Sequence, residues 1–307
     1  ELITSSATHG FLNLLKPEPS SVRAQLKTGA ETFCMLTGLQ AQGLWLPECG
    51  YYEGLEDLIK EAGFSYFFVD SHGLLNGTPR PYYGLTAPVL CPNGIAVFGR
   101  DPDSSRQVWS RDEGYPGDFF YRDFYRDIGF DLDLDYIRPH ILDGEKRIHT
   151  GFKYYRITGK EGDKAVYEPD RAQERVTSHA HDFLFRTQRA LASMGQRQQP
   201  EPVIFSPYDA ELFGHWWFEG IDWLEEFLVL AHNPASTVTM TTPAAYLQAN
   251  PQLQISRPSG SSWGNGGYNA FWLNEGNDWL YPFLHDAADR MRKLVHRFKA
   301  TPPESLE

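Results

Sequence analysis

The sequence has few cysteines and no long hydrophobic run. Its three cysteines, Cys34, Cys49 and Cys91, are odd in number and lack the CxxC spacing of metal ligands. We interpret them as reduced thiols, which favours a reducing compartment and predicts the cytoplasm. No run of about 18 apolar residues is present, so we expect no membrane partner. We also expect no metal ion and no cofactor.

Positive charge is also scarce. The 28 Lys and Arg residues are outnumbered by 40 Asp and Glu residues, which gives a net charge of -12. This balance argues against a nucleic-acid partner, because nucleic-acid binding draws on Lys and Arg, and it favours a neutral polymer. Aromatic residues reach 14%. Sugar rings stack on aromatic faces, so a carbohydrate groove explains this excess, although an aromatic-rich core explains it equally well.

The 307 residues suit a large α/β domain with an appendage. Short apolar runs alternate with helical patterns, as expected for parallel strands joined by crossover helices. The predicted strands are 2–5, 43–47, 65–70, 95–99, 202–206 and 237–241, and the predicted helices are 21–39, 53–62, 170–194 and 278–298. The chain starts without Met and ends in a polar stretch, so we expect both ends to be cut.

A long loop is predicted at residues 73–93, which are rich in Gly, Pro and Tyr and have no periodicity. A loop of this length in a compact domain is usually functional or disordered, so we interpret it as a candidate lid. Tyr82 or Tyr83 is then the side chain that gates the site.

One carboxylate directly follows a predicted strand. In residues 43–51, GLWLPECGY, the apolar strand ends at a proline, and Glu48 comes next. Parallel α/β folds place their chemistry just past the carboxyl ends of strands, which makes Glu48 a candidate catalytic residue. A glutamate at a helix N-terminus, stabilised by the helix dipole, is an open alternative.

A second carboxylate repeats the pattern. Residues 203–206 form an apolar run before Pro207, and Asp209 follows. Three ring-bearing residues come within the next two helical turns: His215, Trp216 and Trp217. Glu211 is an alternative to Asp209, and aspartate is also a preferred helix N-cap. Together, Glu48 and Asp209 fit the pair of carboxyl groups that glycoside cleavage requires, one to attack and one to protonate the leaving oxygen.

More ring-bearing residues lie near the C-terminal end. The segment 263–274, WGNGGYNAFWLN, places Trp263 and Trp272 among glycines and amides. Such a composition suits sugars, whose faces stack on rings while their hydroxyls bond to amides, but an ordinary turn with packed aromatics is an equal alternative. His9 and His72 follow the first and third predicted strands, so both can point into one cleft, although a structural histidine is the commoner outcome.

These motifs resemble glycoside hydrolase family 57, and within it the 1,4-α-glucan branching enzymes. Residues 43–51 and 206–220 are similar to the nucleophile and acid/base segments of the family, which implies that Glu48 is the nucleophile and Asp209 the acid/base. Residues 7–10 are similar to another family motif. Residues 109–118, WSRDEGYPGD, look like the branching subgroup, which implies glucan contacts at two positions, Arg111 and Gly129. The full set of expected substrate contacts is His9, His72, Arg111, Gly129, His215, Trp216, Trp217, Trp263 and Trp272.

The resemblance implies a distorted, TIM-like (β/α)7 barrel that is incomplete in this chain. The catalytic core would span 1–255, with an inserted helical and irregular segment at about 106–200. Residues 256–307 would begin a C-terminal helical region.

The implied activity is a retaining double displacement that cleaves an α-1,4-glucan and transfers the chain to a 6-hydroxyl, which forms an α-1,6 branch. The alternatives are an α-amylase or a 4-α-glucanotransferase of the same family, and a glucan-binding protein without turnover.

Overall fold

The structure is a computed structural model that describes residues 1–142, 144, 146–159, 163–194 and 199–299. The chain forms two compact units. Unit 1 comprises Glu1–Asp101, Arg197–Phe205 and Thr241–Glu307, and unit 2 comprises Pro102–Gln196 and Ser206–Met240. Each unit contains its own buried hydrophobic clusters.

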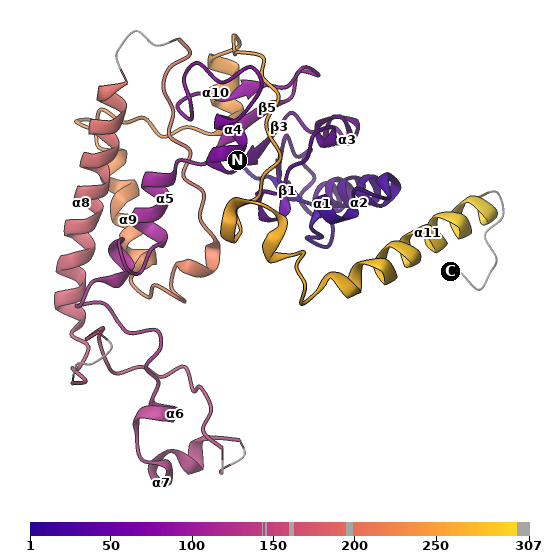
Figure 1. The fold of residues 1–307 in the computed structure, drawn as a ribbon. Helices are drawn as coiled ribbons and strands as arrows, with labels where there is room; N and C mark the ends of the chain where they lie inside the picture. Colours follow the sequence, from indigo (N-terminus) through magenta and orange to yellow (C-terminus); the bar gives the residue numbers. More distant parts are fainter. Residues whose placement is uncertain (143, 145, 160–162, 195–198, 300–307) are drawn as a thin grey trace. The chain divides into compact units, whose positions relative to one another are not determined.

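Unit 1 is built on a five-stranded sheet with the order β1-β2-β3-β5-β4. Figure 1 labels β1, β3 and β5 of this sheet. Its strands are β1 (Thr4–Ser5), β2 (Gly43–Trp45), β3 (Tyr66–Val69), β4 (Val89–Leu90) and β5 (Ala96–Gly99). All neighbours pair in parallel except β4, which runs antiparallel to β5. Parallel neighbours need crossover connections, and α2 (Pro19–Thr37) and α3 (Leu55–Glu61) supply them between β1, β2 and β3.

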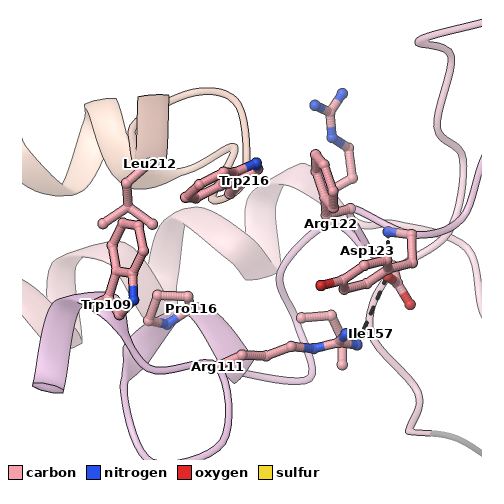
Figure 2. A pocket seen from close by; sticks show the side chains of 10 residues that line it. Trp109, Arg111, Pro116, Arg122, Asp123, Ile157, Leu212 and Trp216 are labelled. Atoms are coloured by element: carbon pink, nitrogen blue, oxygen red, sulfur yellow. Dashed lines mark hydrogen bonds and ion pairs between the residues drawn. The ribbon is translucent and has the colours of Figure 1, made fainter. Parts of the chain in front are cut away.

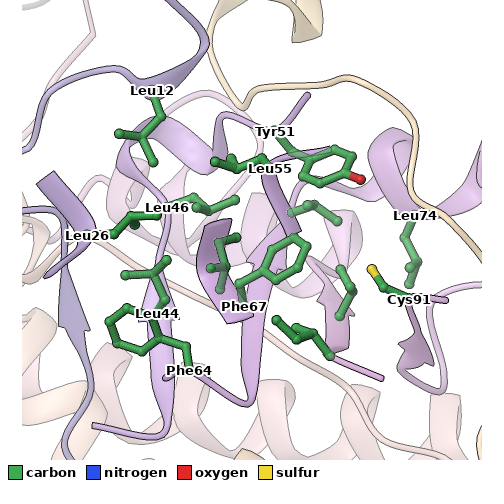
Figure 3. Packing of buried hydrophobic residues seen from close by; sticks show 14 of the residues in the cluster. Leu12, Leu26, Leu44, Leu46, Tyr51, Leu55, Phe64, Phe67, Leu74 and Cys91 are labelled. Carbon is green, nitrogen blue, oxygen red and sulfur yellow. The ribbon is translucent and has the colours of Figure 1, made fainter. Parts of the chain in front are cut away.

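Alternate side chains of the central strand β3 enter two different hydrophobic clusters. Phe67 and Val69 pack into the larger cluster, shown in Figure 3. Tyr66 and Phe68 point to the opposite face and join a second cluster that includes Tyr246. A strand covered on both faces is apolar throughout, which explains why β3 is an uninterrupted hydrophobic run.

The other elements of unit 1 are mostly short. They are α1 (Leu12–Leu15), η1 (Pro47–Cys49), α4 (Ser71–Leu75), α10 (Pro243–Ala249), η5 (Asn265–Gly267), η6 (Asn269–Phe271), η7 (Asp278–Leu280) and α11 (Tyr281–Phe298). The long helix α2 begins at Pro19, whose missing N–H is no loss in a first turn. It ends at Gly38, which adopts a left-handed φ of 72° and donates its N–H to Cys34 O.

Unit 2 consists of helices and loops around a separate core. Its elements are α5 (Pro102–Trp109), η2 (Tyr115–Gly117), α6 (Ile128–Asp131), α7 (Leu134–Ile137), η3 (Arg138–His140), α8 (Pro169–Ser193), η4 (Ala210–Leu212) and α9 (Gly220–Ala231). The helices α8 and α9 pack against each other. Phe183 of α8 meets Trp223 and Phe227 of α9 edge to face, at centroid distances of 5.2 and 5.0 Å.

The predicted helices are confirmed, within a few residues at their ends, as α2, α3, α8 and η7 with α11. The strand predictions at 202–206 and 237–241 are wrong, because neither segment is a strand in the described structure. Val203 N donates to Thr86 O, and Phe205 O accepts from Asp101 N. The segment 202–206 therefore makes one backbone hydrogen bond to each of two separate segments and does not form a β-ladder with either. The loop predicted at 73–93 contains the end of α4 and all of β4.

No helix within the described ranges has the length and hydropathy that crossing a membrane requires.

Candidate active site

The parallel strands of unit 1 place polar side chains at one edge of the sheet. His9 follows β1, Glu48 follows β2, Asp70 and His72 follow β3, and Arg100 follows β5. The carboxyl ends of parallel strands form the edge where α/β folds bind ligands. Sequence reasoning missed Asp70 and Arg100, although each follows its strand as closely as Glu48 follows β2, and that position is the signal that could have found them.

The backbone at Glu48 adopts a left-handed conformation. Its φ is 59°, and φ at Cys49 is 51°, in a region that costs energy for residues other than glycine. Three hydrogen bonds of 2.9 Å hold the turn: Cys49 N to Leu46 O, Gly50 N to Pro47 O, and Trp263 N to Glu48 O. Because Glu48 is not helical, stabilisation by a helix dipole does not account for it.

Each carboxylate oxygen of Glu48 has a neighbour from another segment. Trp263 Nε1 donates to Oε2 at 2.8 Å, and His9 Nε2 lies 3.5 Å from Oε1. His9 has a φ of 53°, and its Nδ1 lies 3.4 Å from Ser5 Oγ. The Glu48 side chain remains 32% exposed, so a ligand can reach the carboxylate.

His72 and Trp272 support the segment that carries Trp263. His72 Nε2 lies 2.5 Å from Gly267 O, within that segment. The Trp272 ring packs on Phe11 with centroids 4.3 Å apart. Both side chains are half-buried, and their contact with substrate stays a prediction.

Asp209 lies in unit 2, directly before η4. It occupies the N-cap position of that turn, and its carbonyl oxygen accepts from Leu212 N at 3.1 Å. Its side chain makes no capping bond to the described amides of η4, so the N-cap alternative does not explain this residue. Asp209 is half-buried, whereas Glu211 is exposed. The acid/base role of Asp209 stays a prediction.

A pocket of about 280 Å³ in unit 2 combines aromatic walls with charged groups (Figure 2). Its lining residues are Trp109, Arg111, Pro116, Arg122, Asp123, Phe124, Tyr125, Ile157, Leu212 and Trp216. Trp109 and Trp216 meet edge to face at 5.2 Å. The Arg111 guanidinium lies 3.9 Å from Asp123 Oδ1 and 4.7 Å from the centre of the Tyr125 ring. Rings beside paired charges suit a polyol, whose faces are apolar and whose rim is polar.

Sequence reasoning named Arg111 and Trp216 but missed other walls of this pocket. Trp109 opens the segment 109–118 that contains Arg111, so its place in that motif was a usable signal. Asp123 and Tyr125 carried no such signal. His215 is exposed, and its ring meets Phe124 of the pocket wall edge to face at 5.1 Å.

Trp217 and Gly129 lie outside the pocket lining. Trp217 is 2% exposed and packs against Tyr121 and Trp223, so we assign it to the core of unit 2. Gly129 N donates to Asp127 Oδ1 at 2.9 Å. A Cβ at Gly129 would lie 2.0 Å from Ile148 O, so close packing by itself requires glycine at this position.

Among the described residues, no group of three or more His, Cys, Asp and Glu side chains is arranged to hold a metal ion.

Comparison with known proteins gives matches along most of the chain. The family model described as glycosyl hydrolase family 57 matches residues 1–256. The 1,4-alpha-glucan branching enzyme of Thermococcus kodakarensis is 35% identical over 97% of this chain and 46% of its own length. The chain thus spans less than half of that curated relative.

Two solved structures are also similar. The alpha-amylase AmyC of Thermotoga maritima has a TM-score of 0.90 at 40% identity, covering 100% of this chain and 58% of that one. A branching enzyme of Pyrococcus horikoshii has a TM-score of 0.82 at 34% identity, covering 96% of this chain and 54% of that one. These likenesses confirm the predicted α/β fold class, and the described five-stranded sheet is consistent with a distorted (β/α)7 barrel that is not closed.

Proposed function

The chain belongs to glycosyl hydrolase family 57, and from this we propose that it carries the catalytic carboxylates of a retaining 1,4-α-glucan branching enzyme. One observation carries the proposal. Glu48 stands at the carboxyl end of a parallel strand, exposed to a ligand and oriented by hydrogen bonds from Trp263 to both its backbone and its carboxylate. A nucleophilic carboxylate needs this combination of access and fixed direction.

The proposed reaction has two displacements. Glu48 attacks the anomeric carbon while the Asp209 carboxylic acid protonates the leaving glucan oxygen, which yields a covalent glucosyl enzyme. Asp209, now ionised, takes the proton of an acceptor hydroxyl as that oxygen attacks the anomeric carbon and releases Glu48. The retaining mechanism requires about 5–5.5 Å between the two carboxyl groups.

Glucan contacts are proposed for the pocket of unit 2. Trp109 and Trp216 offer ring surfaces for the apolar face of a glucosyl unit, and Arg111 and Asp123 offer a donor and an acceptor for its hydroxyls. An α-1,4-glucan fits this chemistry because it is a neutral polymer that repeats the same amphipathic ring. The product would be a branched, glycogen-like polymer, made in the cytoplasm.

The choice between branching and hydrolysis depends on which acceptor reaches the glucosyl enzyme. Water has to be kept out for a 6-hydroxyl to win, and a lid serves this purpose. We propose the loop 73–93 as the lid. Tyr82 is 81% exposed, with its backbone N–H held by Gln254 Oε1 at 2.7 Å, so its ring is available to close over a ligand.

An α-amylase is the second candidate function. Its support is the Thermotoga maritima α-amylase, which matches this chain at a TM-score of 0.90. A 4-α-glucanotransferase and a non-catalytic glucan-binding protein share the proposed glucan contacts but make no α-1,6 bonds.

The test incubates the complete natural protein with amylose and follows iodine staining, reducing ends and product linkages. Branching lowers iodine staining and creates α-1,6 bonds, whereas an amylase raises reducing ends without them. We expect Glu48→Gln to lower the rate by at least about 1,000-fold, because the amide cannot form the covalent intermediate. Glucan binding without any turnover in the unaltered protein would contradict the enzymatic proposal.

A further inference from the structure

Asp70 and Arg100 form a two-pronged ion pair where β3 and β5 end. Arg100 Nε lies 3.1 Å from Asp70 Oδ1, and Arg100 Nη2 lies 3.2 Å from Oδ2. Asp70 also accepts a 2.6 Å hydrogen bond from Ser71 N as the N-cap of α4. Its side chain is only 8% exposed. A planar guanidinium that pairs with both oxygens of an anchored carboxylate has a fixed orientation.

Arg100 presents this oriented guanidinium to Trp263. Arg100 Cζ lies 5.5 Å from the centre of the Trp263 ring, which is a cation–π contact. Trp45 also contacts this ring edge to face, with centroids 5.0 Å apart and an interplanar angle of 63°. An indole has one N–H donor, which lies in the ring plane. The groups that fix the plane of Trp263 therefore also fix the direction of its 2.8 Å hydrogen bond to Glu48 Oε2.

We propose that Asp70 and Arg100 are positioning residues that act through Trp263 to orient the carboxylate of Glu48. This inference rests on the proposed role of Glu48 as nucleophile. Attack at an anomeric carbon needs one carboxylate oxygen aligned with the breaking bond. With Oε2 held by the 2.8 Å hydrogen bond from the indole, Oε1, which lies 3.5 Å from His9 Nε2, is the oxygen that attacks in this proposal.

The alternative is an ion pair that only holds two strand ends together. Removing such a pair would lower stability, but it would not selectively slow the first chemical step. The positioning role has a selective effect, because its loss leaves the substrate contacts in place and misaligns only the attacking oxygen. A hydrogen bond to a charged group is worth a factor of about 10 to 100 in rate when it is made in the transition state.

The experiment measures the first displacement alone. α-Maltosyl fluoride has a leaving group that needs no acid, so its burst of fluoride release reports the attack by Glu48 and not the proton transfer from Asp209. In the complete natural protein, we expect Arg100→Met to slow the burst about 10- to 100-fold with KM within about twofold. Trp263→Phe keeps a ring but loses the N–H, and we expect the same change. The double variant should be no slower than the slower single variant, because both substitutions break one chain of contacts.

Two further variants separate positioning from stability. Asp70→Asn keeps a capping residue for α4 but loses the charge that holds Arg100, so we expect a slower burst in addition to the lower Tm that breaking a buried ion pair causes. Arg257→Met is the matched control. Arg257 lies in the segment that leads to Trp263 and also forms ion pairs, with Glu53 and with the buried Glu56. We expect it to lower Tm and leave the burst rate within about twofold of the unaltered protein.

The proposal would be overturned if the burst rates of Arg100→Met and Arg257→Met were within twofold of each other. It would also be overturned if the effects of Arg100→Met and Trp263→Phe on the burst rate were fully additive. If Arg100→Met does not fold, Arg100→Lys takes its place, since lysine keeps the charge and loses the planar fork, and an unchanged burst would then overturn the proposal. A normal burst in Glu48→Gln would overturn the proposed role of Glu48 itself, which distinguishes that failure from a failure of the positioning role alone.

Discussion

Replacing His179 with glutamine tests how the core of unit 2 responds to acid. His179 lies on α8, is 9% exposed, and has three polar neighbours: Tyr121, Arg175 and Asp118, whose Oδ2 lies 3.5 Å from Nε2. Tyr121 Oη lies 2.8 Å from its Nδ1, and Arg175 Nη2 lies 3.2 Å from its Nε2. A guanidinium only donates, so Nε2 has to accept, and Nδ1 carries the proton and donates to Tyr121. A second proton, on Nε2, would break the hydrogen bond from Arg175 and place a positive charge beside its guanidinium.

Burial, reinforced by the charge of Arg175, lowers the pKa of His179 from 6.5 to about 4, against the opposing pull of Asp118 and Asp182. Between these two pH values the unfolded chain binds a proton at this histidine that the folded chain does not bind. Stability therefore falls as the pH drops from 6.5 to about 4, and below that the contribution of His179 stays constant. The difference corresponds to about 3 kcal/mol of unfolding free energy.

The assay is urea denaturation of both proteins across this pH range, followed by circular dichroism. Glutamine can accept from Arg175 and donate to Tyr121 without titrating, so we expect His179→Gln to remove the extra acid sensitivity of about 3 kcal/mol. Free energies of unfolding that fall in parallel for the two proteins would refute the reasoning.

Three further predictions separate core, pocket and lid. Trp217→Ala should lower the free energy of unfolding by about 3–5 kcal/mol, since the ring is fully packed. Trp216→Ala removes a 38% exposed ring on the pocket wall, so it should change the free energy of unfolding by less than about 1 kcal/mol and raise KM. Urea denaturation measures the stability of both variants, and amylose kinetics measure KM. Tyr82→Ala should raise hydrolysis relative to branching, because a lid without this ring admits water. Linkage analysis measures the ratio, and Tyr83→Ala, which removes a less exposed ring of the same loop, is the comparison.

The sequence predicts well those helices and strands that are determined by the residues within the element itself. α8 follows from apolar residues at helical spacing, and β3 follows from a hydrophobic run between polar stretches. Glu48 can be named as a candidate from the sequence because Pro47 marks the end of a strand, and a carboxylate at that point is a local feature. The failure at 202–206 has a tertiary cause, since an apolar run becomes a strand only if a neighbour is free to pair along its length.

The neighbours Trp216 and Trp217 show where local pattern stops being informative. Both follow Asp209 in one motif, yet one lines the pocket and the other is buried. Gly214, at a φ of 82°, turns the chain so that its N–H donates to Trp217 O, while Trp217 N donates to Leu212 O. This tight loop sends the two rings in different directions, and its path depends on packing against α9, which the motif does not encode.

Left-handed backbone at non-glycine residues is confined, within the described part of the chain, to His9, Glu48 and Cys49. Each such residue costs on the order of 1–3 kcal/mol, and a glycine would carry no such cost. The cost falls where His9 and Glu48 meet, so the strain coincides with the proposed nucleophile. Trp263 offsets part of it by binding both the backbone and the carboxylate of Glu48, from 215 positions away in the sequence. The position of Glu48 as a candidate carboxylate can therefore be inferred from its own strand, but its orientation depends on a distant segment that returns to it.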